Sequence, residues 1–129
     1  MNQRSFVGIV ADQTTGTTKA IDVAWGGGPD YLGKRLLDWY GDDVVKINSL
    51  IGGGSILQLQ FGPGKGLPTG GRTRVYDSPL AYLRNAAFAF GYYGVDYLYL
   101  YDGGWKYCPA WEASSSGWKP LERRERDAS

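Results

Sequence analysis

Basic side chains gather in a glycine-rich segment near the middle of this sequence. Between positions 62 and 84 one acid, Asp77, stands against four cations, Lys65, Arg72, Arg74 and Arg84. Arginines on flexible backbone suit an anion, above all phosphate, because guanidinium groups bond phosphate oxygens in pairs. Trp25 and Tyr76 would offer ring faces for a base. The sequence therefore predicts a site for a phosphate-bearing small molecule, formed by Trp25, Lys65, Arg72, Arg74 and Tyr76. The alternative is a solvated loop with scattered charges.

The same segment excludes one well-known phosphate motif. The run around Lys65 looks superficially like the phosphate-binding loop of nucleotide hydrolases, but that loop needs Ser or Thr directly after Gly-Lys and a helix beyond. Gly66, Leu67 and Pro68 follow instead. A second anion site is conceivable at Gly26-Gly27-Gly28, where N–H groups ahead of a helix converge. A tight strand-to-helix turn is the favoured explanation of these glycines.

Catalytic residue types are scarce. The sequence has no histidine and one cysteine, Cys108, which we interpret as a small buried side chain of a strand. The aspartates occupy no spacing diagnostic of general acid–base catalysis or of a metal site. We therefore expect no metal and no cofactor, and a binding protein rather than an enzyme. A hydrolase with an unrecognised carboxylate pair stays open as an alternative.

Composition narrows the class of protein further. The 129 residues are 43% hydrophobic and 15% aromatic, with 20 glycines and a net charge of +1. A charge this small draws the chain to neither a nucleic acid polymer nor a membrane surface. The first residues lack the apolar run of a secretion signal, and a lone cysteine fits a reducing compartment. These features predict a cytoplasmic protein.

The elements that must position these residues begin with a hairpin. Residues 4–11 and 19–25 read as antiparallel strands around a Thr-rich turn. A helix follows, with Pro29 at its start, Gly41 at its end, and Leu32, Leu36, Trp39 and Tyr40 on one face. A second short helix is capped by Asp42-Asp43 and ends at Gly52. Residues 56–61 resemble a short strand.

The second half of the sequence predicts another helix and another hairpin. Ser78-Pro79 opens a helix whose apolar stripe is Leu80, Leu83, Ala87 and Phe90. Strands over 97–101 and 105–109 flank the turn Asp102-Gly103-Gly104. We predict one α+β domain over residues 1–111, in which both hairpins join one antiparallel sheet with about three helices mainly on one face. Residues 112–129 form a charged C-terminal tail.

The last hairpin carries a stripe of aromatic rings. Five rings would share one face if Leu98 and Leu100 point into the core, namely Tyr97, Tyr99, Tyr101, Trp105 and Tyr107. Such a stripe suits a subunit interface, a stacking platform for a ligand, or a core covered by helices. We expect the interface, and with it a homo-oligomer.

The layout resembles a group of small, mostly uncharacterised proteins of bacteria and their phages. The matching pieces are Ala24-Trp25-Gly26, residues 29–33, residues 36–40 and residues 97–105. The three glycines at 26–28 depart from that group, in which we would expect a histidine nearby and an acidic-glycine-aromatic turn. The resemblance implies a phage anti-defence protein. It would sequester a nucleotide immune signal of the host or, alternatively, block a host protein by direct contact.

Overall fold

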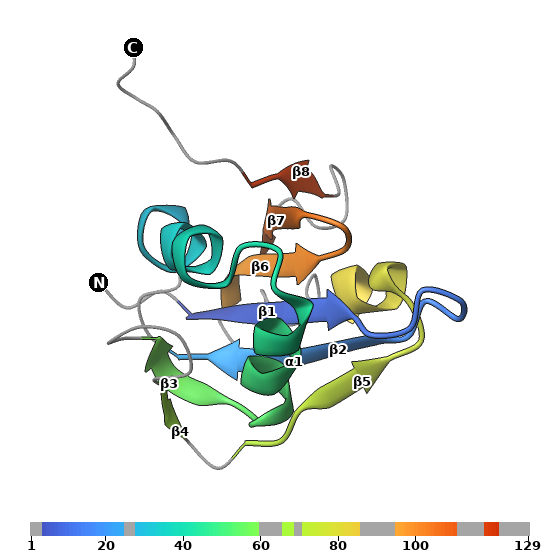
Figure 1. Ribbon diagram of the computed structural model, residues 1–129, viewed down its shortest axis with the longest axis horizontal. Coiled ribbons are helices and arrows are strands. Elements are labelled where there is room, and N and C mark those ends of the chain that lie inside the picture. Colours follow the sequence, from blue (N-terminus) through green and yellow to red (C-terminus); the bar gives the residue numbers. More distant parts are fainter. Residues whose placement is uncertain are drawn as a thin grey trace.

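One mixed sheet organises the chain (Figure 1). The structure is a computed structural model that describes residues 4–24, 28–59, 66–68, 71–85, 95–110 and 118–121. The strands are β1 (Arg4–Val10), β2 (Thr18–Val23), β3 (Ile56–Leu59), β4 (Gly66–Pro68), β5 (Arg74–Tyr76), β6 (Val95–Tyr101), β7 (Trp105–Pro109) and β8 (Lys119–Pro120). Their order is β4-β3-β2-β1-β6-β7-β8, and β5 also pairs with β2. The α+β class predicted from the sequence is confirmed.

Both predicted hairpins are present, and they meet at the centre of the sheet. β1 pairs antiparallel with β2, and β6 pairs antiparallel with β7. The junction between the hairpins is β1 against β6, and these two strands run parallel, with Val7 opposite Tyr99. β2 and β3 are parallel as well. The sheet is therefore mixed, where a wholly antiparallel one was expected, because the hairpins dock side by side in the same direction.

Three helical segments cover one face of the sheet: η1 (Pro29–Gly33), η2 (Leu36–Tyr40) and α1 (Val44–Gly52). The first two belong to the helix predicted from the sequence, with Gly28 as its N-cap and Gly41 at its end, but their turns are π-helical. α1 begins at the predicted cap, since the Asp43 carboxylate accepts a hydrogen bond from the Lys46 N–H at 3.1 Å. Apolar residues of this layer pack on Val7, Ile9, Ile21, Val23 and Tyr99.

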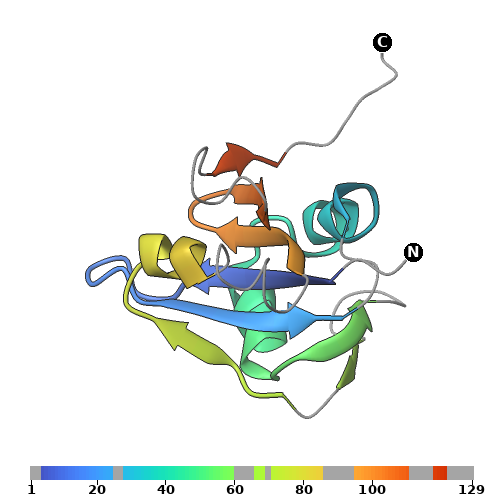
Figure 2. The same cartoon turned by 180° about the vertical axis from the view of Figure 1, so that it is seen from behind.

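The opposite face is covered by the helical residues 79–85, which appear yellow in Figure 2. Ser78 caps this helix as predicted, accepting from the Ala81 N–H at 3.0 Å. The predicted stripe is wrong at Leu80, which is 53% exposed, whereas Tyr82 is fully buried. The Tyr82 ring lies so close to Gly8 of β1 that a Cβ there would stand 3.0 Å from it. Helix position alone thus did not reveal which side chain meets the sheet.

Part of the expected tail belongs to the sheet. β8 pairs antiparallel with β7, and Leu121 is buried in the core beneath Gly33 of η1. Trp118 stacks on Tyr82 with ring centroids 5.7 Å apart. The packed domain therefore extends to residue 121 in the described chain. Residues 122–129 lie outside the described part, so the remainder of the tail prediction stays a prediction.

Candidate functional site

The structure places two of the predicted ligand residues side by side. Arg74 and Tyr76 belong to β5, opposite Ala20 and Thr18 of β2. Since side chains alternate along a strand, both point to one face and Val75 points to the other. Arg72 lies just before the strand and is exposed. Trp25 and Lys65, the other two predicted ligand residues, lie outside the described residues.

Aromatic rings surround Arg74 and Tyr76. The Arg74 guanidinium carbon is 5.7 Å from the centroid of the Phe6 ring, within the range of a cation–π contact. The Tyr76 ring is half-buried with its centroid 5.3 Å from that of Tyr82. Its hydroxyl donates to Asn85 Oδ1 at 3.0 Å. Arg74 is thus exposed above a floor of rings that other elements hold in place.

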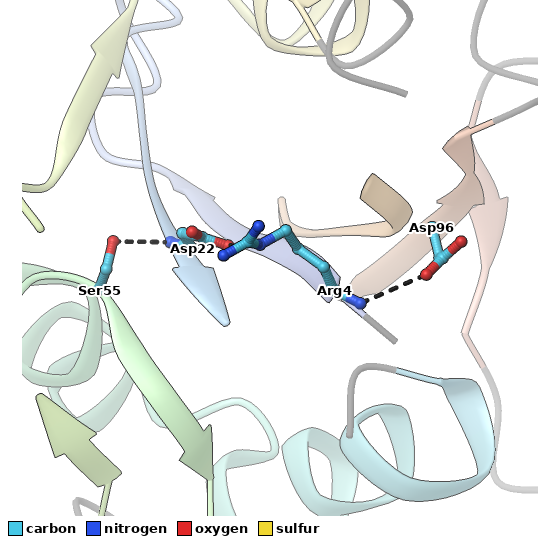
Figure 3. Close-up of polar contacts among 4 residues, drawn as sticks. All are labelled: Arg4, Asp22, Ser55 and Asp96. Atoms are coloured by element: carbon cyan, nitrogen blue, oxygen red, sulfur yellow. Dashed lines mark hydrogen bonds and ion pairs between the residues drawn. The ribbon is translucent and has the colours of Figure 1, made fainter. Parts of the chain in front are cut away.

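A second arginine lies on the same face, at the start of β1. Figure 3 shows Arg4 between Asp22 and Asp96. Its Nε is 3.4 Å from Asp22 Oδ1, and its backbone N–H donates to Asp96 Oδ2 at 3.3 Å. On the other side of Asp22, the Ser55 hydroxyl accepts from the Asp22 N–H at 3.1 Å. We call Arg4, Asp22, Arg74 and Tyr76 the β5 cluster.

The charges of the arginines in the β5 cluster influence the pKa values of its Asp22 and Tyr76. Burial raises the pKa of Asp22 above its ordinary value, and the charges of Arg4 and then Arg74 oppose this rise. Burial likewise raises the pKa of Tyr76, and Arg74 opposes that rise too. Arg4 makes the ion pair with Asp22, whereas Arg74 forms none with any described residue. Arg74 is therefore the cation of the cluster whose charge is least neutralised.

This arrangement can hold an anion more readily than it can transfer a proton. The Tyr76 phenol stays protonated at neutral pH, and its hydroxyl already donates to Asn85. The charges of Arg4 and Arg74 both act on Asp22, but Arg74 forms no ion pair with a described residue and so can still meet an anion. Among the described residues no group of three or more His, Cys, Asp or Glu side chains could hold a metal ion. Binding is the chemistry that these side chains support.

The aromatic stripe of the last hairpin occupies a different place from the one expected. Tyr99, Tyr101 and Trp105 are buried beneath the layer of η1, η2 and α1, so this chain's own helices cover the predicted interface. Tyr101 donates to Asp42 at 2.9 Å, and the Trp105 indole donates to the Gly41 carbonyl at 2.9 Å. The expectation that these three rings form a subunit interface is therefore wrong, and they belong to the hydrophobic core. Tyr97 and Tyr107 are half-buried at its margin.

Sequence reasoning missed Arg4, Asp22 and Asn85 in this site. For Arg4 and Asp22 the signal lies in the register of the first hairpin. Asp22 of β2 pairs with Phe6 of β1, and Arg4 lies two residues before Phe6 and therefore on the same face of the strand. It also missed a contact on the other face of the sheet, where Arg35 stacks between Tyr31 and Trp39. There the spacing of four residues was visible in the sequence.

Comparison with known proteins adds no identification: no family model, curated protein or solved structure matches the chain. Within the described parts of the chain, no helix has the length and apolar character needed to cross a membrane. What this protein does must therefore be argued from its own residues.

Proposed function

We propose that this chain is a non-enzymatic binding protein that captures a phosphate-bearing small molecule at the β5 cluster. The observation that carries the proposal is Arg74, an exposed guanidinium held over the Phe6 ring with no ion pair among the described residues. Such a group is fixed in place and has donors to spare. A phosphate would take up the charge that Asp22, already paired with Arg4, leaves uncompensated.

A nucleotide is the ligand class that fits both the arginines and the aromatic ring of this site. Arg74 and Arg72 would bond the phosphates, and the half-buried Tyr76 ring would contact the base. Lys65 and Trp25 are proposed to join them. The resemblance to small phage and bacterial proteins suggests a nucleotide immune signal of the host, sequestered in the cytoplasm by a phage-encoded protein. Cys108 is buried and is the one cysteine of the sequence, which is compatible with a reducing compartment.

Two other functions remain as alternatives. A phage inhibitor that blocks a host defence protein would need an open surface, and the stripe around Tyr99 does not supply one. A hydrolase would need a carboxylate pair, for which Asp22 and Asp96 are the candidates, since both contact Arg4. A homo-oligomer stays a prediction, through a surface other than the buried rings.

A thermal-shift screen with mono-, di- and cyclic nucleotides tests the proposal. Ligand at a hundredfold excess over its Kd stabilises the folded state by about 2.7 kcal/mol. For a domain of this size that raises Tm by about 10 °C. Recovery of the nucleotide chemically intact from the heated complex excludes the hydrolase. No shift with any nucleotide or with inorganic phosphate would refute the proposal.

A pair of matched variants assigns the binding to this face. Arg72→Ala with Arg74→Ala should abolish the nucleotide-induced shift while lowering Tm by only a few degrees, because an exposed cation–π contact contributes about 0.5–1 kcal/mol. Lys19→Ala is the control: Lys19 is an exposed cation on the neighbouring strand that pairs with Val75, so its side chain leaves from the opposite face. Its shift should equal that of the native chain. Normal binding by the double variant would mean that the segment is only a connector.

A further inference from the structure

Three side chains form a stack along the helical stretch 29–40. Tyr31, Arg35 and Trp39 follow one another at intervals of four residues. The Arg35 guanidinium carbon lies 3.7 Å from the centroid of the Tyr31 ring and 5.1 Å from that of the Trp39 ring. All three side chains are half-buried. We call these three residues the arginine stack.

The stack fixes Arg35 without neutralising it. Both rings attract the cation through their electron-rich faces, and they remove rotamer freedom that a bound partner would otherwise have to restrict. Arg35 forms no ion pair with any described residue, although Asp38 stands three positions further along. Its Nε is buried and has no hydrogen-bond partner among these residues, and Nη1 reaches only the Tyr31 carbonyl at 3.5 Å. The fork of Nη1 and Nη2 is thus left underused.

The neighbouring Lys34 shows what a solvated cation looks like on the same helix. It is exposed, and acids stand four residues to either side of it, Asp30 and Asp38. At the corresponding positions around Arg35, four residues before it and four after it, the chain has the aromatic residues Tyr31 and Trp39. The chain therefore places one cation near carboxylates in the sequence and the next one between rings. Neither cation forms an ion pair among the described residues, but only Arg35 is held in place by rings.

We infer that the arginine stack is a binding site for a carboxylate, supplied by an Asp or Glu side chain of a protein partner. A planar guanidinium edge matches a carboxylate with two parallel hydrogen bonds. Trp, Tyr and Arg are also the residues that dominate binding energy at protein interfaces. The half-buried rings of Tyr31 and Trp39 add apolar surface beside the guanidinium, which a protein segment covers and a small free anion does not. Finally, π-helical turns such as those of η1 and η2 occur frequently at functional sites.

This site is independent of the β5 cluster. The helical stretch packs on the face of the sheet that carries Val7 and Tyr99, whereas Arg74 lies over Phe6 on the opposite face. Each of the two sites can accordingly be removed without touching the other.

An NMR titration of the full chain tests the inference with a defined probe. The probe is the capped peptide Gly-Glu-Gly, and the capped peptide Gly-Gln-Gly is its uncharged match. We expect the Trp39 indole N–H and the Arg35 Nε–H resonances to shift saturably with the Glu peptide, with a Kd of about 10 mM or tighter. Arg35→Lys keeps the charge but loses the fork, so it should weaken binding at least about fivefold. Lys34→Gln, the control, should change it less than about twofold.

Several results would overturn the assignment. Equal shifts with the Gln peptide would show that the carboxylate is not recognised, and equal losses in Arg35→Lys and Lys34→Gln would reduce the effect to general attraction by positive charge. Binding of inorganic phosphate without binding of the peptide would also refute a carboxylate partner. If Arg35→Lys fails to fold by circular dichroism, the comparison of Glu and Gln peptides on the native chain still decides.

Discussion

Gly8 is the position where one added methyl group should cost the most. A Cβ at Gly8 would stand 3.0 Å from Tyr82 Cε2 and 3.1 Å from the Lys19 carbonyl oxygen. Neither neighbour can withdraw, because Lys19 is held in the β1–β2 ladder and the buried Tyr82 hydroxyl donates to the Tyr99 carbonyl at 2.9 Å. Overpacking of this kind costs about 1–3 kcal/mol, and the lower backbone entropy of Ala offsets about 0.5–1 kcal/mol.

We therefore expect Gly8→Ala to lower the free energy of unfolding by about 1–2 kcal/mol. In urea this moves the midpoint down by about 0.5–1 M at an unchanged slope. Gly52→Ala is the control, since a Cβ at Gly52, the last residue of α1, meets no atom within 4 Å. That change should leave stability unchanged or raise it by up to about 1 kcal/mol, because Ala is the better helix former.

A double-mutant cycle with Tyr82→Leu isolates the steric cause. Leu removes the ring atoms that a methyl group at Gly8 would strike, so Gly8→Ala should cost at least about 1 kcal/mol less in that background than in the native chain. Additive costs would mean that the ring is not the obstacle. A fully stable Gly8→Ala protein would refute the packing of the helix 79–85 on β1.

Three further changes probe other parts of the fold. Burial raises the pKa of Asp22 above 3.8, so the stability that its proton contributes is complete below about pH 4 and is lost as the pH rises through the folded pKa. Asp22→Asn should therefore flatten the slope of unfolding free energy against pH in the range just above 3.8, and an unchanged slope would contradict the burial of this carboxyl group. Tyr99→Glu should unfold the chain rather than dissociate an oligomer, seen as loss of the near-ultraviolet circular dichroism signal, because it would bury a carboxylate in the core. Asp43→Ala should cost about 1 kcal/mol in urea denaturation by removing the cap of α1, whereas an unchanged midpoint would contradict the bond to Lys46.

Local chemistry explains why much of the fold is predictable from the sequence. The turn Asp102-Gly103-Gly104 defines the second hairpin, and Pro29 and Gly41 mark the ends of the first helix. The parallel pairing of β1 with β6 has no such local signal, because it joins segments that are distant in the sequence. The π-helical hydrogen bonds of η1 and η2 are likewise invisible in an apolar pattern that suits an α-helix equally well.

Period-2 patterns are uninformative where both faces of a strand are apolar. β6 alternates Tyr with Leu, so either set of side chains can be the buried one. The structure buries Leu98 and Leu100 under the helix 79–85 and Tyr99 and Tyr101 under the other helices. The stripe became core because helices cover both faces, which depends on the packing of the whole chain.

The sequence predicts the placement of neighbours in one strand but not that of partners from other strands. Arg74 and Tyr76 are two residues apart, so extended backbone suffices to place them together. Arg4 and Asp22 join them only through the register of β1, β2 and β5. The arginine stack needed only a spacing of four, but Trp39 was interpreted as part of the apolar face of the helix and Tyr31 was given no role.

The parallel junction also has a consequence for how the protein is made. Arg4 pairs with Val95, so about 90 residues must leave the ribosome after β1 before β6 can dock, which takes roughly 5–20 s at common rates of synthesis. Until then the first hairpin exposes the edge of β1, whose run of Phe6, Val7, Ile9 and Val10 is apolar. Nascent chains are consequently most prone to aggregate in this interval. The speed at which the middle of the message is translated will then influence the yield of folded protein.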